Sequence, residues 1–363
     1  MLKSTKYLLV GSTEAYSGKS ATILGIASQL QARNICVGYG KLIGTYFGDA
    51  HTDGLEEDIR LISETLNLPS DRLYPPLLSL NESTISKQVA GEDDNHYQQQ
   101  LAHYLTDNQS DITILEGPGT LDEGKLFGLS MPEVAEAIDT SVLLVARYHS
   151  ALIVDPILSA KERMGDRLMG VMINDVPDKE MKSVTETVIP FLESQGIPIF
   201  GVLPQSEVLR SVSVNELVKQ LNAEILCCGD RLDLMVESLK IGAMNVNSAL
   251  KYFRKARNMA VVTGGDRTDL QLAALETSTH CLILTGHIAP TATVLSRAEE
   301  LEIPILSVDL DTLTTVEIID HTFGQVRLQE PIKVECIRDL MAKYFDVDQL
   351  IHKLGLELVS GLS

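Results

Sequence analysis

The sequence lacks several features that would assign it to common classes of protein. No apolar run approaches the roughly 20 residues that a helix needs to cross a bilayer; the longest runs are Tyr7–Val10, Val142–Ala146 and Cys281–Leu284. Basic residues are scarce, with 30 Lys and Arg against 50 Asp and Glu, and they form no basic stripe. The resulting formal charge of −20 opposes the approach of phosphate backbones. We therefore expect a soluble protein with no membrane and no nucleic acid among its partners.

Cysteines are also few, and their spacing does not match that of a zinc site. The chain has five cysteines, mostly in apolar segments, and none has the C-x₂-C spacing of a zinc site. They are Cys36, Cys227, Cys228, Cys281 and Cys336. We predict free thiols in a reducing cytoplasm, and no nucleophile among them.

Short apolar runs alternate with helical patterns along the chain, which is typical of a parallel sheet covered by helices. With 363 residues, two domains are expected. The pattern predicts a parallel-sheet α/β domain over residues 1–215, a second, smaller α/β domain over 216–330, and a C-terminal helical segment over 331–363. The expected strands are Tyr7–Val10, Ile35–Leu42, Thr113–Glu116, Ser141–Ala146, Met169–Ile173, Ile197–Leu203, Ala223–Cys228, Met259–Thr263, His280–Thr285, Ile303–Ser307 and an edge strand Gln325–Leu328. The expected helices include Ser20–Gln31, Asp58–Leu66, Asn95–Asn108, Met131–Ile138, Val154–Met164, Asp178–Gln195, Glu335–Phe345 and Asp348–Leu356, and 79–95 is expected to be a surface connection.

The first strand leads into a phosphate-loop pattern. Gly11-Ser-Thr-Glu-Ala-Tyr-Ser-Gly-Lys-Ser20 lies between that strand and a strongly helical stretch. Backbone N–H groups and the positive end of a helix dipole would then point at one anion. Lys19 adds a full charge, and Ser20 offers a hydroxyl to Mg²⁺. The strict spacing is not met, because the first glycine lies seven residues before Gly18, but the position between strand and helix predicts binding of the phosphates of ATP. The residues predicted to contact the nucleotide here are Gly11, Thr13, Glu14, Ser17, Gly18, Lys19, Ser20 and Ala21.

A second buried strand ends in an acid. The run Ile112-Thr-Ile-Leu-Glu116 is followed by Gly-Pro-Gly119. An unpaired carboxylate in an apolar setting is costly, so packing alone does not explain Glu116. A nucleotide-bound Mg²⁺ needs such a carboxylate opposite the phosphate loop. We therefore expect Glu116 to be associated with the metal.

These motifs together resemble the dethiobiotin synthetase-type P-loop domain, through Gly11…Gly18-Lys19-Ser20, Lys41 at the end of the second strand, Leu-Glu116-Gly-Pro-Gly119 and Asn174-Asp175. The resemblance implies that Lys19 and Lys41 act at the reaction centre, with Lys41 near the γ-phosphate. It implies Ser20, Asp58 and Glu116 as magnesium ligands, and it places Asn174, Asp175 and Pro204 at the adenine nucleotide. It also implies a homodimer or a higher homo-oligomer.

The sequence departs from that family in two places. The loop between Gly11 and Gly18 is one residue longer, and Thr120 stands where the family usually has another glycine. These departures put the binding of a second substrate in doubt more than nucleotide binding. Two structural readings also stay open, in which Asp58 is a solvated acid at a helix start and Asn174 is a turn former.

The second domain contains another strand, glycine loop and helix. Met259–Thr263 is followed by Gly-Gly-Asp-Arg-Thr268, and Thr268 with Gln271 matches a T-x-x-Q capping box. The stretch is similar to the DRTGG domain, and the resemblance covers about residues 216–330. The glycines permit close approach of a ligand, and the Arg could fork onto a phosphate or carboxylate. The predicted ligand residues for a small-molecule effector or protein partner are Gly264, Gly265, Asp266, Arg267 and Thr268. The alternative is a tight turn with an Arg–Asp surface pair.

The two domains occur in this order in the regulatory part of long phosphotransacetylases, ahead of the catalytic domain. No third domain follows Leu356 in this sequence, so we expect no acetyl transfer to phosphate. The expected function is that of an adenine-nucleotide-binding regulatory or sensor protein with ATP and Mg²⁺ as cofactors. The alternatives are an ATP-dependent ligase of the dethiobiotin synthetase type and a slow ATPase switch. His149, which follows the fourth strand, is expected to be a hydrogen-bonded loop residue.

Overall fold

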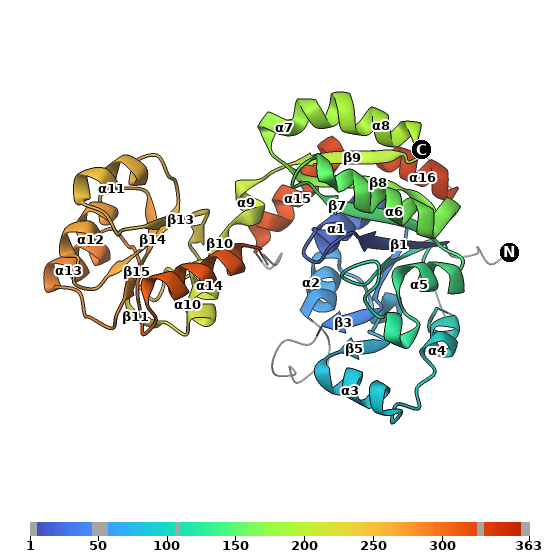
Figure 1. The fold of residues 1–363 in the computed structure, drawn as a ribbon, viewed down its shortest axis with the longest axis horizontal. Helices are drawn as coiled ribbons and strands as arrows, with labels where there is room; N and C mark the ends of the chain where they lie inside the picture. Colours follow the sequence, from blue (N-terminus) through green and yellow to red (C-terminus); the bar gives the residue numbers. More distant parts are fainter. Residues whose placement is uncertain (1–5, 46–56, 106–108, 325–329, 357–363) are drawn as a thin grey trace. The chain divides into compact units, whose positions relative to one another are not determined.

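The computed structural model describes residues 6–45, 57–105, 109–324 and 330–356. The chain divides into two compact units, of which one comprises Met1–Gln205 with Leu328–Ser363 and the other Ser206–Arg327 (Figure 1). The first unit contains a large parallel sheet and the second a smaller α/β sheet, so the predicted fold class is confirmed. Within the described ranges, no helix combines the length and the apolar character needed to cross a membrane.

The first unit is built on a seven-stranded parallel sheet in the order β4-β2-β6-β1-β7-β8-β9. Its central strands are buried along nearly their whole length, as expected for a parallel sheet with helices on both faces. The strands are β1 (Lys6–Ser12), β2 (Val37–Lys41), β4 (Leu73–Tyr74), β6 (Ile112–Glu116), β7 (Ser141–Arg147), β8 (Leu168–Val176) and β9 (Ile199–Pro204), and β3 (Ile43–Thr45) pairs separately with β5 (Leu78–Leu80). The strands predicted in this unit exist, with ends that move by one to three residues.

Two sets of helices cover this sheet. Residues of α4 to α8 share one apolar core with one face of the strands. On the other face, α1 contacts β8, since Thr22 Oγ1 lies 3.9 Å from Met172 Sδ. The helices are α1 (Lys19–Gln31), α2 (Glu57–Leu66), α3 (Glu82–Ala90), α4 (Tyr97–Tyr104), α5 (Met131–Ala137), α6 (Val154–Met164), α7 (Asp178–Ser183) and α8 (Ile189–Ser194).

Two expectations in this unit need correction. The predicted surface connection 79–95 contains the exposed helix α3, which starts at a capping box formed by Asn81 and Thr84. The single helix predicted over Asp178–Gln195 is interrupted by a π-helical turn at Val184–Val188. Pro190 follows at the start of α8, and proline has no N–H for the regular helical bond, which accounts for the irregular stretch before it.

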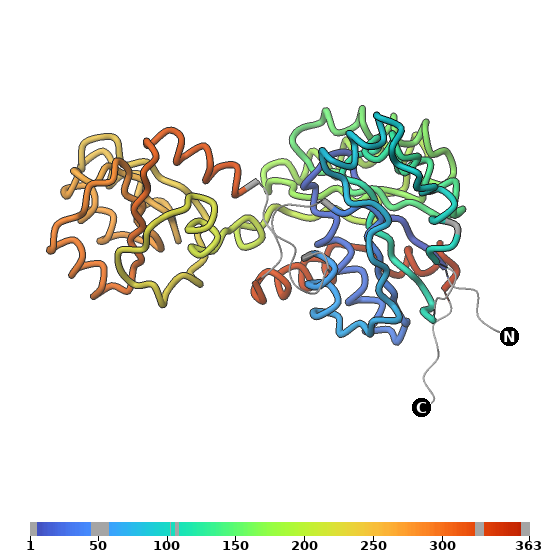
Figure 2. Tube along the Cα trace, turned by 90° about the horizontal axis from the view of Figure 1, so that it is seen from below, coloured from blue at the N-terminus to red at the C-terminus, as the bar shows by residue number. Residues whose placement is uncertain are grey.

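The C-terminal helices α15 (Pro331–Tyr344) and α16 (Val347–Leu354) return to the first unit. A Cβ on Gly25 of α1 would lie 2.3 Å from Met341 Cγ, so this glycine allows α1 and α15 to approach closely. Figure 2 shows the same helices, in red, beside the blue start of the chain. The domain limits expected at residues 215 and 330 stay predictions. The two compact units divide between Gln205 and Ser206.

The second unit has a five-stranded sheet in the order β11-β16-β15-β14-β13, in which only β11 is antiparallel to its neighbour. The strands are β11 (Glu224–Cys227), β13 (Ser238–Ile241), β14 (Met259–Gly264), β15 (Thr279–Thr285) and β16 (Ile305–Val308), with a small pair β10 (Val212–Ser213) and β12 (Met235–Val236). The helices are α9 (Glu207–Arg210), α10 (Val214–Leu221), α11 (Val246–Phe253), α12 (Thr268–Leu275), α13 (Ala292–Glu300) and α14 (Thr312–Gly324). Helices α11 to α13 pack on one face, and α10 and α14 on the other. The predicted edge strand Gln325–Leu328 lies outside the described residues, and β13 was not predicted.

Candidate functional site

The candidate site lies at the carboxyl edge of the central strands of the first unit. Glu116, the last residue of β6, is the register partner of Val10 in β1 and of Lys41 in β2. The loop after β1 leads into α1, which begins at Lys19. The parallel register therefore brings the phosphate loop, Glu116 and Lys41 to the same edge of the sheet.

The phosphate loop depends on glycine at both of its ends. Gly11 lies inside β1, and a Cβ there would come within 2.0 Å of Met131 Cε in α5, so a side chain would require the end of Met131 to move. Gly18 has φ 96°, a left-handed conformation, and a Cβ there would lie 2.4 Å from Asn174 Nδ2. Thr13 N donates to the carbonyl of Val145. Gly18 is thus the glycine that the loop conformation itself requires.

Lys19 is buried at the start of α1. Its Nζ donates to Ser12 Oγ at 2.9 Å. Burial lowers the pKa of Lys19, and repulsion from Lys41 lowers it further, while attraction to Glu116, Glu123 and Asp58 acts in the opposite direction. Burial has removed water from this ammonium group. An anion that bound beside it would compensate for that lost hydration and would therefore be bound favourably.

The hydroxyl of Ser20 and the carboxylate of Glu116 meet directly, because Ser20 Oγ donates to Glu116 Oε1 at 3.0 Å. The other carboxylate oxygen, Oε2, accepts from the hydroxyl of Tyr39 at 2.7 Å. Asp58, the third predicted metal ligand, instead has its Oδ2 2.5 Å from Lys41 Nζ. The structure brings Ser20 and Glu116 together and places Asp58 on the predicted catalytic lysine.

This arrangement fits a magnesium ion that arrives with a nucleotide. Mg²⁺ in nucleotide sites is held by one or two carboxylates, phosphate oxygens and several waters, not by a full protein cage. Ser20 and Glu116 supply the hydroxyl and carboxylate oxygens that such an ion needs. Across the described ranges, no three His, Cys, Asp or Glu side chains form a cluster able to hold a metal. The donor set therefore suits a metal that phosphate oxygens help to bind.

Of the three residues predicted at the base, Asn174 contacts the phosphate loop. Asn174 Nδ2 donates to the carbonyl of Ser17 at 2.8 Å. Asp175 has φ 61°, and its Oδ2 accepts from Arg147 Nε at 3.0 Å. Pro204 is the last residue of β9. Asn174 is thus more than a turn former, since its side chain fixes the loop backbone next to Gly18.

One polar atom inside the loop has no bond in the described part of the chain. Ser17 Oγ is buried and has no hydrogen-bond partner there. Buried hydroxyls in native proteins are nearly always paired, so an orphaned one calls for an explanation. A bound group beside the loop would supply the missing partner.

Sequence reasoning missed several members of this site. Ser12 receives the Lys19 bond, and its Oγ lies 2.8 Å from the carbonyl oxygen of Glu14. His149 Nε2 lies 2.7 Å from Glu14 Oε1, so the expected loop histidine contacts the phosphate loop itself. Tyr39 was detectable, because it lies two residues before Lys41 and therefore on the same face of the same strand. Glu123 gave no signal, because only the folded chain brings it near Lys19.

The arginine of the glycine loop in the second unit is bonded to neighbouring residues. Arg267 donates through Nε to Asp269 Oδ1 at 3.1 Å and through Nη2 to the carbonyl of Met244 at 3.1 Å. A Cβ on Gly265 would lie 2.1 Å from the carbonyl oxygen of Ile288. These contacts match the alternative of a tight turn with an Arg–Asp pair. A ligand role for Gly264, Gly265, Asp266, Arg267 and Thr268 stays a prediction.

The predicted capping box at this helix does not form. Helix α12 begins at Thr268, after an N-cap residue, Arg267, that has no side-chain cap bond. Gln271 Nε2 instead donates to the carbonyls of Gly264 and Gly265, at 2.9 Å and 3.0 Å. The T-x-x-Q pattern is thus used to hold the turn, because Gln271 is fully buried beneath it.

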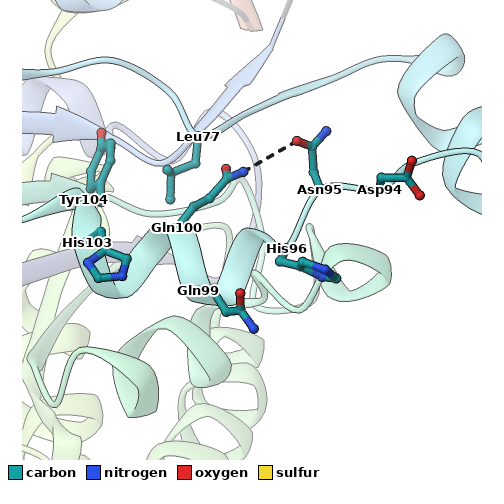
Figure 3. Close-up of a pocket in the computed structure, with 8 residues that line it drawn as sticks. All are labelled: Leu77, Asp94, Asn95, His96, Gln99, Gln100, His103 and Tyr104. Atoms are coloured by element: carbon teal, nitrogen blue, oxygen red, sulfur yellow. Dashed lines mark hydrogen bonds between the residues drawn. The ribbon is translucent and has the colours of Figure 1, made fainter.

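A hollow of about 540 Å³ lies elsewhere in the first unit, along α4 (Figure 3). Most of the residues that line it have polar side chains, and Figure 3 shows Gln100 directed toward Asn95, with Nε2 and Oδ1 3.5 Å apart. The lining residues are Leu77, Asp94, Asn95, His96, Gln99, Gln100, His103 and Tyr104. None of them is a predicted site residue, so this hollow is separate from the phosphate loop.

Comparison with known families matches both units. Residues 6–213 match the model of the AAA domain, and residues 216–322 match that of the DRTGG domain. The predicted pairing of a P-loop-type domain with a DRTGG domain is thereby confirmed.

Several curated relatives are named phosphate acetyltransferase. The protein of Nitratidesulfovibrio vulgaris is 26% identical over 96% of this chain and 51% of its own length. That of Deinococcus radiodurans is 25% identical over 98% of this chain and 52% of its own length. The chain spans about half the length of these relatives, so the matches give no support to the expectation that acetyl transfer is absent.

Among solved structures, one match is the CBS and DRTGG domains of the regulatory region of Clostridium perfringens pyrophosphatase, complexed with the activator diadenosine tetraphosphate. It is 15% identical, covers 47% of this chain and 85% of that chain, and has a TM-score of 0.29. A score this low carries no argument about the present chain.

Proposed function

We propose, from the premise that this chain belongs to the AAA domain family, that it is a regulatory protein whose first unit binds an adenine nucleotide with Mg²⁺. The observation that carries the proposal is the meeting of Lys19, Ser20 and Glu116 at the start of α1. Ser20 and Glu116 are 96 residues apart in the sequence, yet they share a hydrogen bond of 3.0 Å. Neither packing nor a surface role accounts for a buried lysine and a buried carboxylate beside the half-buried Ser20 hydroxyl at one helix start.

Each residue has a distinct role in this proposal. The N-terminus of α1 and Lys19 bind the phosphates, and Lys41 lies near the γ-phosphate. Ser20 and Glu116 hold Mg²⁺, with Asp58 available once it leaves Lys41. When bound, the metal neutralises part of the phosphate charge. Asn174, Asp175 and Pro204 border the base.

The local charge balance supports a role for magnesium in this proposal. The charges around Lys19 are unequal in number. One further lysine, Lys41, acts on it, and three acids do so, namely Glu116, Glu123 and Asp58. A nucleotide triphosphate without a metal would add negative charge to a region that already has an excess of acids. We therefore expect ATP affinity to depend strongly on Mg²⁺.

The regulatory part of the proposal is supported by the domain combination. A DRTGG domain follows the P-loop domain, and relatives of similar sequence are phosphate acetyltransferases. In this proposal the second unit receives a small-molecule effector or a protein partner, and the protein acts as a homodimer or higher oligomer. The output is a change in an interaction.

Isothermal titration calorimetry tests the proposal. The purified chain is titrated with ATP and with ADP, each in excess Mg²⁺ and in EDTA, with GTP as the control for the base. The expected result is binding of adenine nucleotides that weakens greatly in EDTA. Absence of binding in Mg²⁺, or equal binding with and without it, would reject the proposed site.

Lys41 favours a second candidate function. It is a second buried lysine, 6% exposed, at the end of β2 beside Asp58 and opposite Glu116. Phosphoryl transfer relies on positioning and charge stabilisation, which such a lysine would provide. An ATP-dependent ligase or slow ATPase predicts phosphate release that Lys41→Ala suppresses, and a ligase predicts stimulation by diamino acids with bicarbonate or by simple carboxylates. If phosphate release stayed at the background level under all these conditions, the regulatory proposal would be the one that remains.

The expected absence of acetyl transfer to phosphate has its own assay. The chain is incubated with acetyl phosphate and coenzyme A, and acetyl-coenzyme A is measured. We expect none above the rate without protein. Turnover would assign the chain the activity named for its relatives.

A further inference from the structure

The carboxylate of Glu116 is held from two sides. Ser20 Oγ donates to Oε1 at 3.0 Å, and Tyr39 OH donates to Oε2 at 2.7 Å. The distance from Tyr39 OH to Oε2 falls at the upper end of the range of about 2.5–2.7 Å for a hydroxyl that donates to a carboxylate. Tyr39 is fully buried, and Glu116 is 4% exposed. Water therefore does not compete readily for either end of this bond.

The sheet explains how Tyr39 reaches the acid. Tyr39 pairs in register with Ile114, and Lys41 pairs with Glu116. Tyr39 is thus the diagonal neighbour of Glu116, at a separation that long aromatic side chains bridge. Residues two apart on a strand point to the same face, so Tyr39 and Lys41 share a face of β2. One strand supplies both a lysine opposite the acid and a hydroxyl bound to it.

We propose that Tyr39 is a positioning residue that fixes the Glu116 carboxylate so that Oε1 is presented to Ser20 for the magnesium ion. This inference rests on the proposed function, because it needs a metal at Ser20 and Glu116. The Tyr39 bond engages Oε2 and leaves Oε1 on the side of the phosphate loop. Hydrogen bonds to ligating carboxylates restrict their rotation and raise metal affinity, and their removal costs about 10- to 100-fold in that affinity.

A different role is possible for any buried tyrosine, since its hydroxyl usually takes a partner for packing reasons alone. The two roles predict different results. A purely structural bond stabilises the fold and leaves the metal dependence of nucleotide binding unchanged. A positioning bond changes the magnesium requirement and leaves metal-free binding unchanged.

The test is Tyr39→Phe, which removes only the hydroxyl oxygen. ATP affinity is measured by calorimetry on the full chain over a series of Mg²⁺ concentrations and in EDTA. We expect the Mg²⁺ concentration for half of the affinity gain to rise about 10-fold or more, while affinity in EDTA stays at the wild-type value. Tyr7→Phe is the matched control, because Tyr7 lies on β1, on the other side of β6, and its OH donates to the carbonyl of Leu105. This substitution should leave both measurements unchanged.

A double-variant cycle tests whether Tyr39 acts through Glu116. In a Glu116→Gln background, adding Tyr39→Phe should cause no further change in the magnesium requirement, because the two substitutions act on one interaction. An additional change there would overturn the inference. So would a Tyr39→Phe protein with the wild-type magnesium requirement, one that loses affinity equally in Mg²⁺ and EDTA, or one that no longer folds, since each assigns the hydroxyl a structural role only.

The wild-type titration separates this inference from the proposal beneath it. If the wild-type chain shows no magnesium-dependent ATP binding, the proposed function itself fails. If it does, and Tyr39→Phe behaves like wild type, the nucleotide site stands and only the role of Tyr39 is rejected.

Discussion

The chain contains two strand–glycine loop–helix segments, and they differ in what surrounds them. In the first unit, the loop between β1 and α1 gathers a desolvated Lys19, the Ser20–Glu116 pair and the Ser17 hydroxyl, which has no hydrogen-bond partner in the described part of the chain. In the second, the loop between β14 and α12 has its Arg267 bound to Asp269. Among the described residues, each loop has one buried oxygen without a hydrogen bond, Ser17 Oγ in the first and Gln271 Oε1 beneath the second. The loops differ in their charged groups, because the cation of the second loop, Arg267, is already paired with Asp269.

The glycines of the two loops show the same contrast. Gly18 is needed because the backbone has φ 96° where the loop enters a helix. Gly265 is needed because a Cβ would lie 2.1 Å from the carbonyl oxygen of Ile288. A glycine loop between a strand and a helix therefore predicts tight backbone geometry. Whether it also binds a ligand depends on charges brought in by other strands.

Lys19→Ala should produce the largest difference between the two loops. Removing a charged donor to phosphate costs about 1.5–3 kcal/mol, or about 10- to 100-fold in ATP affinity. The matched substitution Arg267→Ala in the second loop should leave ATP affinity unchanged. Calorimetric titration of both variants checks the comparison. Equal losses would mean that both loops contribute to one site, and no loss for Lys19→Ala would end the phosphate-loop assignment.

Gly265→Ala should affect stability instead of nucleotide binding. The backbone of Ile288 is not a flexible obstacle, so overpacking should cost about 1–3 kcal/mol of the free energy of unfolding. Gly264→Ala is the control, because its nearest atom is the mobile carboxylate of Asp266 at 2.5 Å, and it should cost less. Urea unfolding followed by circular dichroism measures both. A smaller effect for Gly265→Ala than for Gly264→Ala would contradict the packing explanation.

The pH dependence of stability should separate Lys19 from Arg267. Burial lowers the pKa of Lys19 below its ordinary 10.5, so between the lowered pKa and 10.5 the unfolded chain binds more protons than the folded one. Stability therefore gains from this residue as pH rises through that window. Below the lowered pKa, the buried charge costs its full penalty.

The variant Lys19→Met removes that titration. We expect it to be more stable than wild type at neutral pH, by a margin that shrinks as pH approaches 10.5. Arg267→Met should show no such trend, because the pKa of Arg267 is raised by its bond to Asp269 and its charge persists. Urea midpoints measured from pH 7 to 10 give the comparison. A margin for Lys19→Met that stays constant or grows with pH would contradict the stated cause.

The smallest effect is expected for the Arg267–Asp269 pair itself. Both side chains are substantially exposed, at 35% and 52%, and exposed ion pairs contribute little to folding. Asp269→Asn should shift the urea midpoint less than Gly265→Ala does. A thermal-shift screen of metabolites with wild type and Asp269→Asn would reveal a ligand of this loop, since such a ligand raises stability by mass action. A hit whose shift depends on Arg267 would restore the ligand role predicted from the sequence.

Much of the fold was predictable because its signals are local. The strand β1, the helix α1 and the strand β14 follow from apolar runs bounded by glycine loops. Local signals failed where neighbours far along the chain decided the outcome. Gln271 matches a helix cap, but it lies buried under the turn and binds the carbonyls of Gly264 and Gly265 instead.

The site shows the same limit. Glu116 was identifiable because a buried strand that ends in an acid is unusual on energetic grounds. Ser12 and Glu123 were not identifiable, since they have no motif of their own and only the folded chain brings them to Lys19. The magnesium role implied for Asp58 stays a prediction, and its contact with Lys41 could not be derived from spacing.

The sequence by itself determined the α/β class, the phosphate loop after the first strand and the candidate acid, because backbone preference and the pattern of burial are written in neighbouring residues. The tertiary structure alone decided which charges meet. Parallel register placed Glu116 between the phosphate loop and Lys41, and the contacts of Arg267 closed the second loop. Electrostatic and hydrogen-bonding energies depend on distance in space, and distance along the chain says little about them.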